Sequence, residues 1–270
     1  MKVFIDSQPT FMQLQDIKIA TYMYGSHNKE NIFFIHGLGS STQLNYPALQ
    51  NLSAQYNLYT FDLPGHGHSQ GFEDYSFTNL STLCYSVLQH FQLKDFYLIG
   101  HSMGGLLSAQ LSKILGCKGL VLSCTAGIKI NKIKQLGLNI MKKSGTSIIK
   151  HKQAVISSIL KDMKQIGQEE VLIIQQKLFD ESYEEYMNTF LKIIKQFPLS
   201  NKENIFKEIT VPYGIIICTK DKMVDNKSIL QLLEKQAHVI KKLRKRHELT
   251  MQDPVLFAET VLEILQQLTM

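Results

Sequence analysis

The 270-residue sequence has none of the features of a disulfide-rich secreted protein or of a membrane-spanning protein. No Cys-x-x-Cys pair occurs, so we expect reduced, buried thiols at Cys84, Cys117, Cys124 and Cys218. No apolar run reaches the length of a membrane span, which predicts a chain without an integral membrane segment. The first residues, Met1–Asp6, hold one basic residue and an apolar run too short for a signal peptide. Together these absences predict a cytoplasmic protein.

Hydrophobic residues make up 44% of the chain and charged residues 19%, which is typical of one large globular domain or of a domain with an insertion. The formal charge of +6 is concentrated: residues 129–164 hold nine lysines and one acid, and residues 241–246 hold five basic residues. Neither cluster is interleaved with aromatic residues, so no nucleic-acid partner is expected. Solvated faces are the simplest interpretation. Attraction of an anionic substrate or an acidic membrane surface is the alternative.

Short apolar runs alternate with segments of helical period, a pattern typical of parallel strands joined by crossover helices. Strands are expected at 17–24, 31–35, 56–61, 96–99 and 119–124, and helices at 77–91 and 103–115. The strand pattern resumes at 212–217 and 238–243. Asp253 as N-cap and Pro254 as first helical residue begin a last helix, which is expected to end at Leu268.

Between the two groups of strands, only helical periodicity is present. Apolar positions recur on one helix face from Val155 to Ile166 and on another from Tyr183 to Ile194. We therefore expect a core of residues 1–127 and 206–270 and a helical insertion of residues 128–205. An insertion between two late strands is expected to form a cap or lid over the carboxyl edge of the sheet, where open α/β folds bind ligands.

The pentapeptide Gly100–Gly104 has the form Gly-x-Ser-x-Gly and stands directly between an expected strand and an expected helix. A serine hydroxyl is a weak nucleophile unless it is held out from the backbone beside a base, and a sharp strand-to-helix turn holds it in that way. The flanking glycines let the chain turn without a Cβ clash. Ser102 is therefore a candidate nucleophile.

Two further motifs lie upstream: His36-Gly37-Leu38-Gly39 follows one strand, and residues 62–69 read Asp-Leu-Pro-Gly-His-Gly-His-Ser after the next. With the Ser102 pentapeptide, they make the chain resemble the α/β-hydrolase family over nearly its whole length. The resemblance implies an α/β fold: a mostly parallel α/β-hydrolase sheet flanked by helices, with a helical cap inserted between two late strands. Within that family, the chain is most similar to carboxylesterases and monoacylglycerol lipases.

The family's chain order of nucleophile, acid and histidine implies that the catalytic base follows Ser102. Three histidines do so. His151 lies in the insertion and His238 opens a strand, whereas His247 stands just past the end of that strand. His247 is therefore the candidate base.

The acid should follow a strand between the nucleophile and the base, where it orients the imidazole and stabilises its protonated form. Asp221 resembles the acid of the family's Gly-x-x-Asp pattern. The sequence departs from the family at two places, because Cys218 replaces the glycine of that pattern and Arg246 stands where a glycine often precedes the histidine. Asp225 is the alternative acid.

The resemblance also implies which groups stabilise the alkoxide that forms when an ester carbonyl is attacked. These are the backbone N–H groups of Leu38 and Met103, so both side chains are left free to shape the acyl pocket. His36 and Asp62 are expected to brace the loop and the neighbouring turn rather than to react.

These residues predict hydrolysis of a carboxylic ester, with Ser102 attacking, His247 as base and a water releasing the acid. No cofactor or metal is expected, because no acid or cysteine cluster accompanies His66 and His68. The expected partner is a small-molecule ester, with an acyl chain as one option. The alternatives are an acyl-CoA or other thioesterase, which the lysines would suit, a C–C bond hydrolase, and a hydrolase-like ligand-binding protein with little turnover. The sequence makes no prediction of the oligomeric state.

Overall fold

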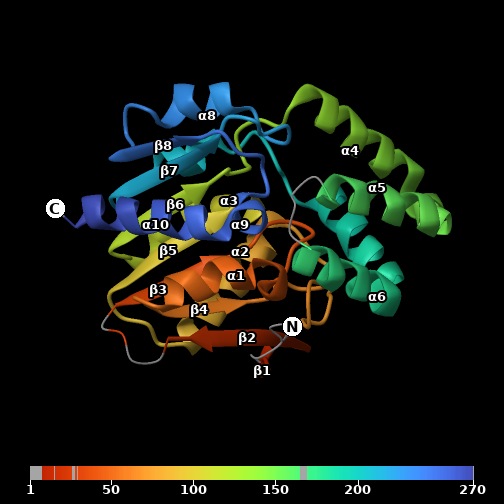
Figure 1. Ribbon diagram of the computed structural model, residues 1–270, viewed down its shortest axis with the longest axis horizontal. Helices are drawn as coiled ribbons and strands as arrows, with labels where there is room; N and C mark the ends of the chain where they lie inside the picture. The colour runs from red at the N-terminus through yellow and green to blue at the C-terminus, as the bar shows by residue number, and fades with distance from the viewer. Residues whose placement is uncertain (1–7, 15, 26–27, 29, 165–168, 270) are drawn as a thin grey trace.

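Eight strands form a single sheet in the computed structural model, which describes residues 8–14, 16–25, 28, 30–164 and 169–269 (Figure 1). The strands are β1 Thr10–Leu14, β2 Ile17–Tyr24, β3 Asn31–Ile35, β4 Asn57–Phe61, β5 Phe96–His101, β6 Gly119–Ser123, β7 Tyr213–Cys218 and β8 Val239–Leu243. Their order is β1-β2-β4-β3-β5-β6-β7-β8. β2 pairs antiparallel with β1 and with β4, and the other neighbours pair parallel. The predicted mostly parallel sheet is confirmed.

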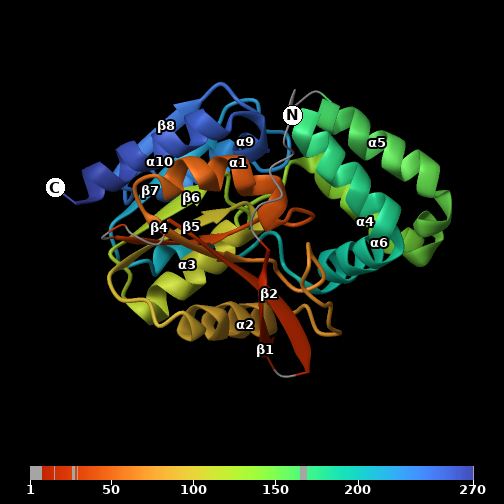
Figure 2. The ribbon, with the colours of Figure 1, turned by 60° about the horizontal axis from the view of Figure 1, so that its bottom comes forward.

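The central strands are buried on both faces, which explains why they appear in the sequence as unbroken apolar runs. In β3, Phe33 and Ile35 join the core on one face, and Ile32 and Phe34 join the core on the other. Helices α2 Phe77–His90, α3 Met103–Leu115 and α8 Asn226–Leu233 pack on the first face. Helices α1 Thr42–Ser53 and α10 Pro254–Leu268 pack on the second, and Figure 2 shows these layers from the side. Two short helices, α7 Glu203–Lys207 and α9 Leu249–Gln252, complete the core.

Within the core, the predicted strands and helices agree with the observed ones to within two residues at each end. The last helix begins as predicted, because the Asp253 carboxylate accepts a hydrogen bond from the N–H of Leu256 at 3.2 Å and Pro254 follows it. Strand β1 and helix α1 were not predicted. β1 is an edge strand of five residues, and α1 contains Pro47, which ordinarily argues against a helix.

A helical segment separates β6 from β7. It consists of α4 Lys132–Ser144, a 3-10 helix at Gly145–His151, α5 Lys152–Lys164 and α6 Glu169–Gln196. A bridge between Ile130 and Val224 ties the start of this segment to the loop after β7. Figures 1 and 2 show the three α-helices together at one end of the sheet. The predicted positions Met1–Asp6 and Ile166 lie outside the described residues, and the boundaries and capping role of the insertion stay predictions.

None of the helices within the described ranges combines the length and the apolar composition needed to cross a bilayer.

Candidate active site

Ser102 stands alone between the end of β5 and the start of α3, with φ of +54° and ψ of −117°. Residues that carry a side chain rarely adopt these backbone angles, so the turn at Ser102 is strained. The glycines on either side are required by space. A Cβ at Gly100 would lie 2.3 Å from the carbonyl oxygen of Gly104, and a Cβ at Gly104 would lie 2.1 Å from that of Ile35. The Gly-x-Ser-x-Gly pattern therefore reflects a turn into which no other side chains fit.

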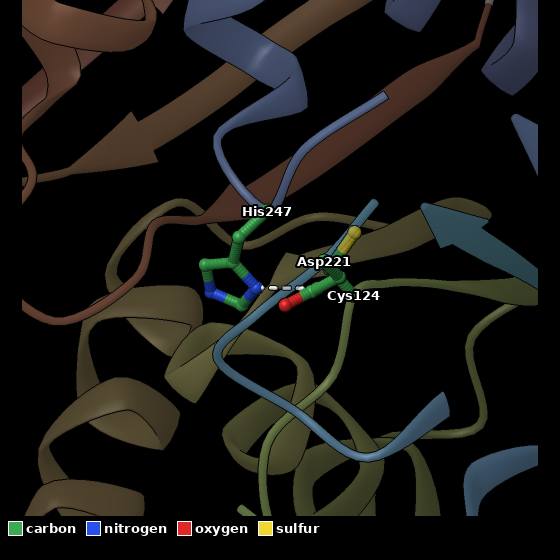
Figure 3. A group of neighbouring side chains, drawn as sticks. All are labelled: Cys124, Asp221 and His247. Atoms are coloured by element: carbon green, nitrogen blue, oxygen red, sulfur yellow. Dashed lines mark hydrogen bonds and ion pairs between the residues drawn. The ribbon is translucent and has the colours of Figure 1, made fainter. Parts of the chain in front are cut away.

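Ser102, His247 and Asp221 are joined by two short hydrogen bonds. The Ser102 Oγ lies 2.8 Å from His247 Nε2, and His247 Nδ1 lies 2.7 Å from Asp221 Oδ2. Figure 3 shows the imidazole turned toward the carboxylate. The other carboxylate oxygen accepts hydrogen bonds from the N–H groups of Met223 at 2.7 Å and Val224 at 3.1 Å. These hydrogen bonds hold both oxygens of the Asp221 carboxylate in place, and the carboxylate in turn orients the His247 ring.

The charges in this cluster are mutually supportive. Burial lowers the pKa of His247, but the Asp221 carboxylate outweighs burial, so that the pKa lies above the ordinary value of 6.5. Burial raises the pKa of Asp221, but the charge of His247 and the hydrogen bonds that the Asp221 carboxylate accepts outweigh burial. The pKa of Asp221 therefore lies below its ordinary value. An ionised Asp221 accepts the proton on Nδ1, which leaves Nε2 free to accept the proton of the serine hydroxyl.

Three of four successive parallel strands supply this cluster, since Ser102 follows β5, Asp221 follows β7 and His247 follows β8. Cys124, which lies beside the cluster, follows β6. Because β5 to β8 are parallel neighbours, their carboxyl ends meet at one edge of the sheet.

Asp225 lies at a different place. Its side chain caps α8 by accepting hydrogen bonds from the N–H groups of Lys227 at 3.1 Å and Ser228 at 3.3 Å. It also forms an ion pair with Lys129 at 3.6 Å. Such contacts are typical of a helix N-cap.

The loop after β3 runs directly against Ser102. A Cβ at Gly37 would lie 3.0 Å from the Ser102 Cβ, so the loop that carries Leu38 approaches the serine closely. Met103 is the first residue of α3, and its N–H therefore has no partner within the helix. These are the two residues whose amides the sequence predicted as oxyanion donors.

Two buried histidines hold this loop. His36 Nδ1 donates to the carbonyl of Gly37 at 2.8 Å, and its Nε2 accepts a backbone N–H at 3.0 Å. His66 Nε2 accepts the N–H of Gly39 at 3.1 Å, and its Nδ1 donates to a backbone carbonyl at 3.0 Å. Burial lowers the pKa of His36 to about 4 and that of His66 to about 3, so both rings are neutral. Sequence reasoning missed this role of His66, whose partner lies 27 residues away.

Asp62 is fully buried, and its carboxylate accepts three hydrogen bonds, from the Tyr22 hydroxyl at 2.8 Å and from the N–H groups of Thr42 at 2.7 Å and His68 at 2.9 Å. These contacts fit the structural role expected for Asp62. The His68 ring is exposed and contacts the Tyr22 hydroxyl at 2.9 Å. Since both ring nitrogens of His66 are occupied by the backbone, His66 and His68 do not form a metal pair.

Cys124 extends the cluster. Its sulfur, a carboxylate oxygen of Asp221 and a ring nitrogen of His247 all lie within 4.8 Å of one another, close enough to bind one metal ion (Figure 3). A hydrogen bond with Cys218, and then burial, raise the pKa of the Cys124 thiol well above its ordinary value. A metal ion bound here would have to displace the proton that His247 Nδ1 and Asp221 Oδ2 share at 2.7 Å.

Two further residues at the site were not singled out from the sequence. The His101 ring lies 5.2 Å from the His247 ring, and burial lowers its pKa to about 3, so it packs there as a neutral group. The Tyr186 hydroxyl, from α6, donates to the carbonyl of Gly39 at 3.2 Å. Tyr186 lies on the apolar helix face predicted from Tyr183 to Ile194, a local pattern that does not indicate this contact. Its contact links the helical segment to the loop beside Ser102.

Comparison with known proteins matches residues 32–260 to a model described as the Alpha/beta hydrolase family. The chain belongs to this family.

Individual relatives of this α/β hydrolase are similar over shorter stretches. The uncharacterized hydrolase YugF of Bacillus subtilis (strain 168) is 33% identical over 108 residues, which cover 38% of this chain and 40% of that protein. A probable lysophospholipase, BODYGUARD 3 of Arabidopsis thaliana, is 34% identical over 104 residues, which cover 36% of this chain and 20% of that protein. The matched segments thus span less than half the length of these relatives.

Among solved structures, the enol-lactonase of Burkholderia xenovorans LB400 superposes with a TM-score of 0.77 at 18% identity. The superposition covers 95% of this chain and 100% of that chain. At this identity, the likeness demonstrates a common fold.

Proposed function

We propose that this α/β hydrolase cleaves a carboxylic ester through an acyl-enzyme on Ser102, with His247 as general base and Asp221 as the acid that orients it. The observation that carries the proposal is the continuous hydrogen-bond path from Ser102 Oγ through His247 to Asp221, with distances of 2.8 Å and 2.7 Å. These distances suit proton transfer between nucleophile and base.

In the first step, His247 Nε2 takes the hydroxyl proton as Ser102 Oγ bonds to the ester carbonyl carbon. The negative charge that develops on the carbonyl oxygen is stabilised by the N–H groups of Leu38 and Met103. The intermediate then collapses, the alcohol leaves with the proton from His247, and the acyl group stays on Ser102. In the second step, a water gives a proton to His247 and attacks the acyl carbon. The acid leaves, and the proton returns to Ser102.

The helical segment of residues 128–205 is proposed to cap this site and to select the acyl group. Its link to the loop beside Ser102, from Tyr186 to Gly39, supports that role. Much of its apolar surface packs internally: Phe179, Tyr183 and Met187 are buried together with Ile156. The name of one relative, a probable lysophospholipase, favours an acyl ester as substrate.

The decisive experiment is labelling with a fluorophosphonate, which loses fluoride as its phosphorus bonds to an activated serine oxygen. We expect rapid labelling of the wild type and none of Ser102→Ala. Ser108→Ala is the matched control, because Ser108 is buried in α3 behind the same turn and should leave labelling intact. A wild type that is not labelled would overturn the proposal in favour of a ligand-binding protein.

A substrate panel then tests the class of bond. We expect higher kcat/KM for p-nitrophenyl esters of varied acyl length than for the matching acyl-CoA thioesters, all depending on Ser102. A consistent preference for CoA thioesters would make the protein a thioesterase and would leave the nucleophile assignment standing.

A further inference from the structure

Helix α4 carries an exposed apolar stripe. Ile133, Leu136 and Ile140 are 81%, 62% and 56% exposed. Their spacing of three and four residues puts them on one face of the helix. Gly137 lies on the same face, and a Cβ placed there would meet no atom within 4 Å. This face of α4 is therefore open to solvent along its length.

The stripe is unlike the other exposed apolar positions of the described chain. The remaining large exposed hydrophobic side chains lie singly on different elements: Phe11, Met23, Ile114, Ile173 and Val255. In α4, by contrast, the buried position is Leu138, on the opposite side of the helix, where α4 packs on α6 and the 3-10 helix. Figure 1 shows α4 at the outer edge of the molecule, far from the C-terminus. Single exposed apolar residues are ordinary on protein surfaces, but an aligned set marks a contact site.

Lysines border this stripe. Lys132 and Lys143 flank it on one side, as their positions on the helix require, and both are exposed. Neither of them forms an ion pair with a residue that the structure describes. Residues 129–164 hold nine lysines and one acid, so the positive charge of the chain is concentrated around α4. The single acid in this stretch is Asp162, so most of these lysines have no acid near them in the sequence.

An open hollow of about 530 Å³ adjoins the lysine side of the stripe. It is lined by residues of α4 and of the loops beside it: Lys129, Ile130, Lys132, Gln135, Leu136, Asn139, Ser200 and Asn201. Cationic and hydrogen-bonding groups beside exposed apolar side chains match a molecule that is anionic at its head and apolar behind it. A phospholipid in a bilayer has this order of groups, whereas a soluble anion would have no use for the stripe.

We propose that α4 is a membrane-docking helix that lies in the interface of an anionic phospholipid bilayer. Ile133, Leu136 and Ile140 enter the boundary between headgroups and acyl chains, and the flanking lysines contact lipid phosphates. Both parts are required, because a short apolar stripe binds weakly by itself and lysines alone bind reversibly through screened charge. The proposal does not depend on which bond Ser102 cleaves.

The absence of tryptophan from the sequence provides a direct test. Ile140→Trp would introduce a single reporter on the stripe. We expect its fluorescence to shift to the blue and to rise when vesicles of phosphatidylcholine with about one-third phosphatidylglycerol are added. Val255→Trp is the control, because Val255 is 51% exposed on α10, away from α4. Its fluorescence should not change. A reporter at position 140 that behaves like the control would overturn the proposal.

Vesicle sedimentation tests the two parts separately. We expect the triple variant Ile133→Ser/Leu136→Ser/Ile140→Ser to lose more than about tenfold in partition onto the anionic vesicles. We expect Lys132→Glu/Lys143→Glu to lose at least about twentyfold, at about fivefold per lysine contact removed. Wild-type binding should weaken with salt and on pure phosphatidylcholine. Lys207→Glu/Lys227→Glu, exposed lysines on α7 and α8, is the charge control and should keep most of its binding.

Equal binding by the wild type and the triple variant would overturn the proposal, as would equal binding to neutral and anionic vesicles. Self-association of the wild type that the triple variant abolishes, without vesicle binding, would show that a second copy of the chain covers the stripe. Far-UV circular dichroism and a thermal unfolding midpoint like those of the wild type would establish that all variants are folded, without relying on activity.

Discussion

Replacing Asp221 with asparagine tests the proposed mechanism most sharply, because the change removes one charge and almost no volume. In the wild type, Asp221 Oδ2 accepts the Nδ1 proton of His247 at 2.7 Å, and the carboxylate side chain is fully buried. An asparagine at this position has lost the negative charge that stabilises the imidazolium formed during attack. It can also present its N–H₂ group to Nδ1, which would favour the wrong tautomer of the ring.

The size of the effect follows from this contact. Two unit charges about 4 Å apart interact by about 4 kcal/mol at an effective dielectric constant of about 20. A barrier raised by about 4 kcal/mol slows the reaction by about 10³, at 1.36 kcal/mol for each factor of ten. Loss of the correct tautomer brings the expected decrease in kcat to between about 10³ and 10⁴. KM should change little, because the Asp221 carboxylate is bonded to His247 and to the N–H groups of Met223 and Val224, and the proposed mechanism gives it no role in substrate binding.

The assay is the pH dependence of kcat/KM for a water-soluble p-nitrophenyl ester. In the proposed mechanism, His247 acts as a base only when its ring is neutral. Activity should therefore rise with pH through the pKa of His247, with a midpoint above the ordinary 6.5 in the wild type. Asp221→Asn should move this midpoint to lower pH, because burial of the imidazole remains and the carboxylate that opposed it is gone.

Asp225→Asn is the control for this experiment. Asparagine is as good an N-cap as aspartate, so α8 should keep its cap and activity should stay within about threefold of the wild type. If Asp221→Asn kept more than about a tenth of the wild-type kcat, or if Asp225→Asn lost more activity than Asp221→Asn, the assignment of the acid would be wrong.

Two predictions concern stability. The buried neutral histidines His36, His66 and His101 have pKa values lowered to about 4, 3 and 3, so the unfolded chain binds more protons than the folded one below about pH 6.5. The free energy of unfolding, from urea denaturation, should therefore fall by roughly 1 kcal/mol per histidine for each pH unit between pH 6 and 4.5; a flat profile would contradict this. Gly104→Ala should cost about 3 kcal/mol or more, since its Cβ would lie 2.1 Å from a backbone oxygen. Gly137→Ala, where the Cβ meets open space within α4, should raise stability by about 0.5–1 kcal/mol, and the opposite order of the two variants would refute the packing argument.

The elements that could be predicted from the sequence are those whose signal is local. β3 and β5 are short apolar runs, and α10 begins at an aspartate followed by a proline; both kinds of signal lie within a few residues of the element they define. Helix α1 has no such signal. Its sequence contains Pro47, and it forms because Ser41 caps it and its apolar side pairs with α10 in the core, a contact between opposite ends of the chain.

The residues of the candidate site also divide into those with a local signal in the sequence and those without one. Ser102 could be singled out because the glycines around it are needed by the turn itself. Its hydrogen bond to His247 spans 145 residues and depends on the order of β5 to β8 in the sheet. Hydrophobic periodicity does not predict that order; here it was implied by the resemblance to a family. The hydrogen bond between the Cys124 and Cys218 thiols could not be predicted either, because it also depends on strand order. It forms where the carboxyl ends of the neighbouring strands β6 and β7 lie side by side.

The backbone of Gly39 joins the core to the helical segment beside the proposed nucleophile. Its N–H is bound by His66, which belongs to the core, and the carbonyl of the same residue is bound by Tyr186, which belongs to α6. Gly39 adopts φ of +73°, and a Cβ there would lie 2.7 Å from the Tyr186 oxygen, so no larger residue could keep both contacts. Leu38 directly precedes Gly39, whose backbone is held by His66 and Tyr186. The position of its proposed oxyanion amide therefore depends on α6 as well as on the sheet, and a displacement of the helical segment on binding a substrate or a bilayer would be felt beside Ser102.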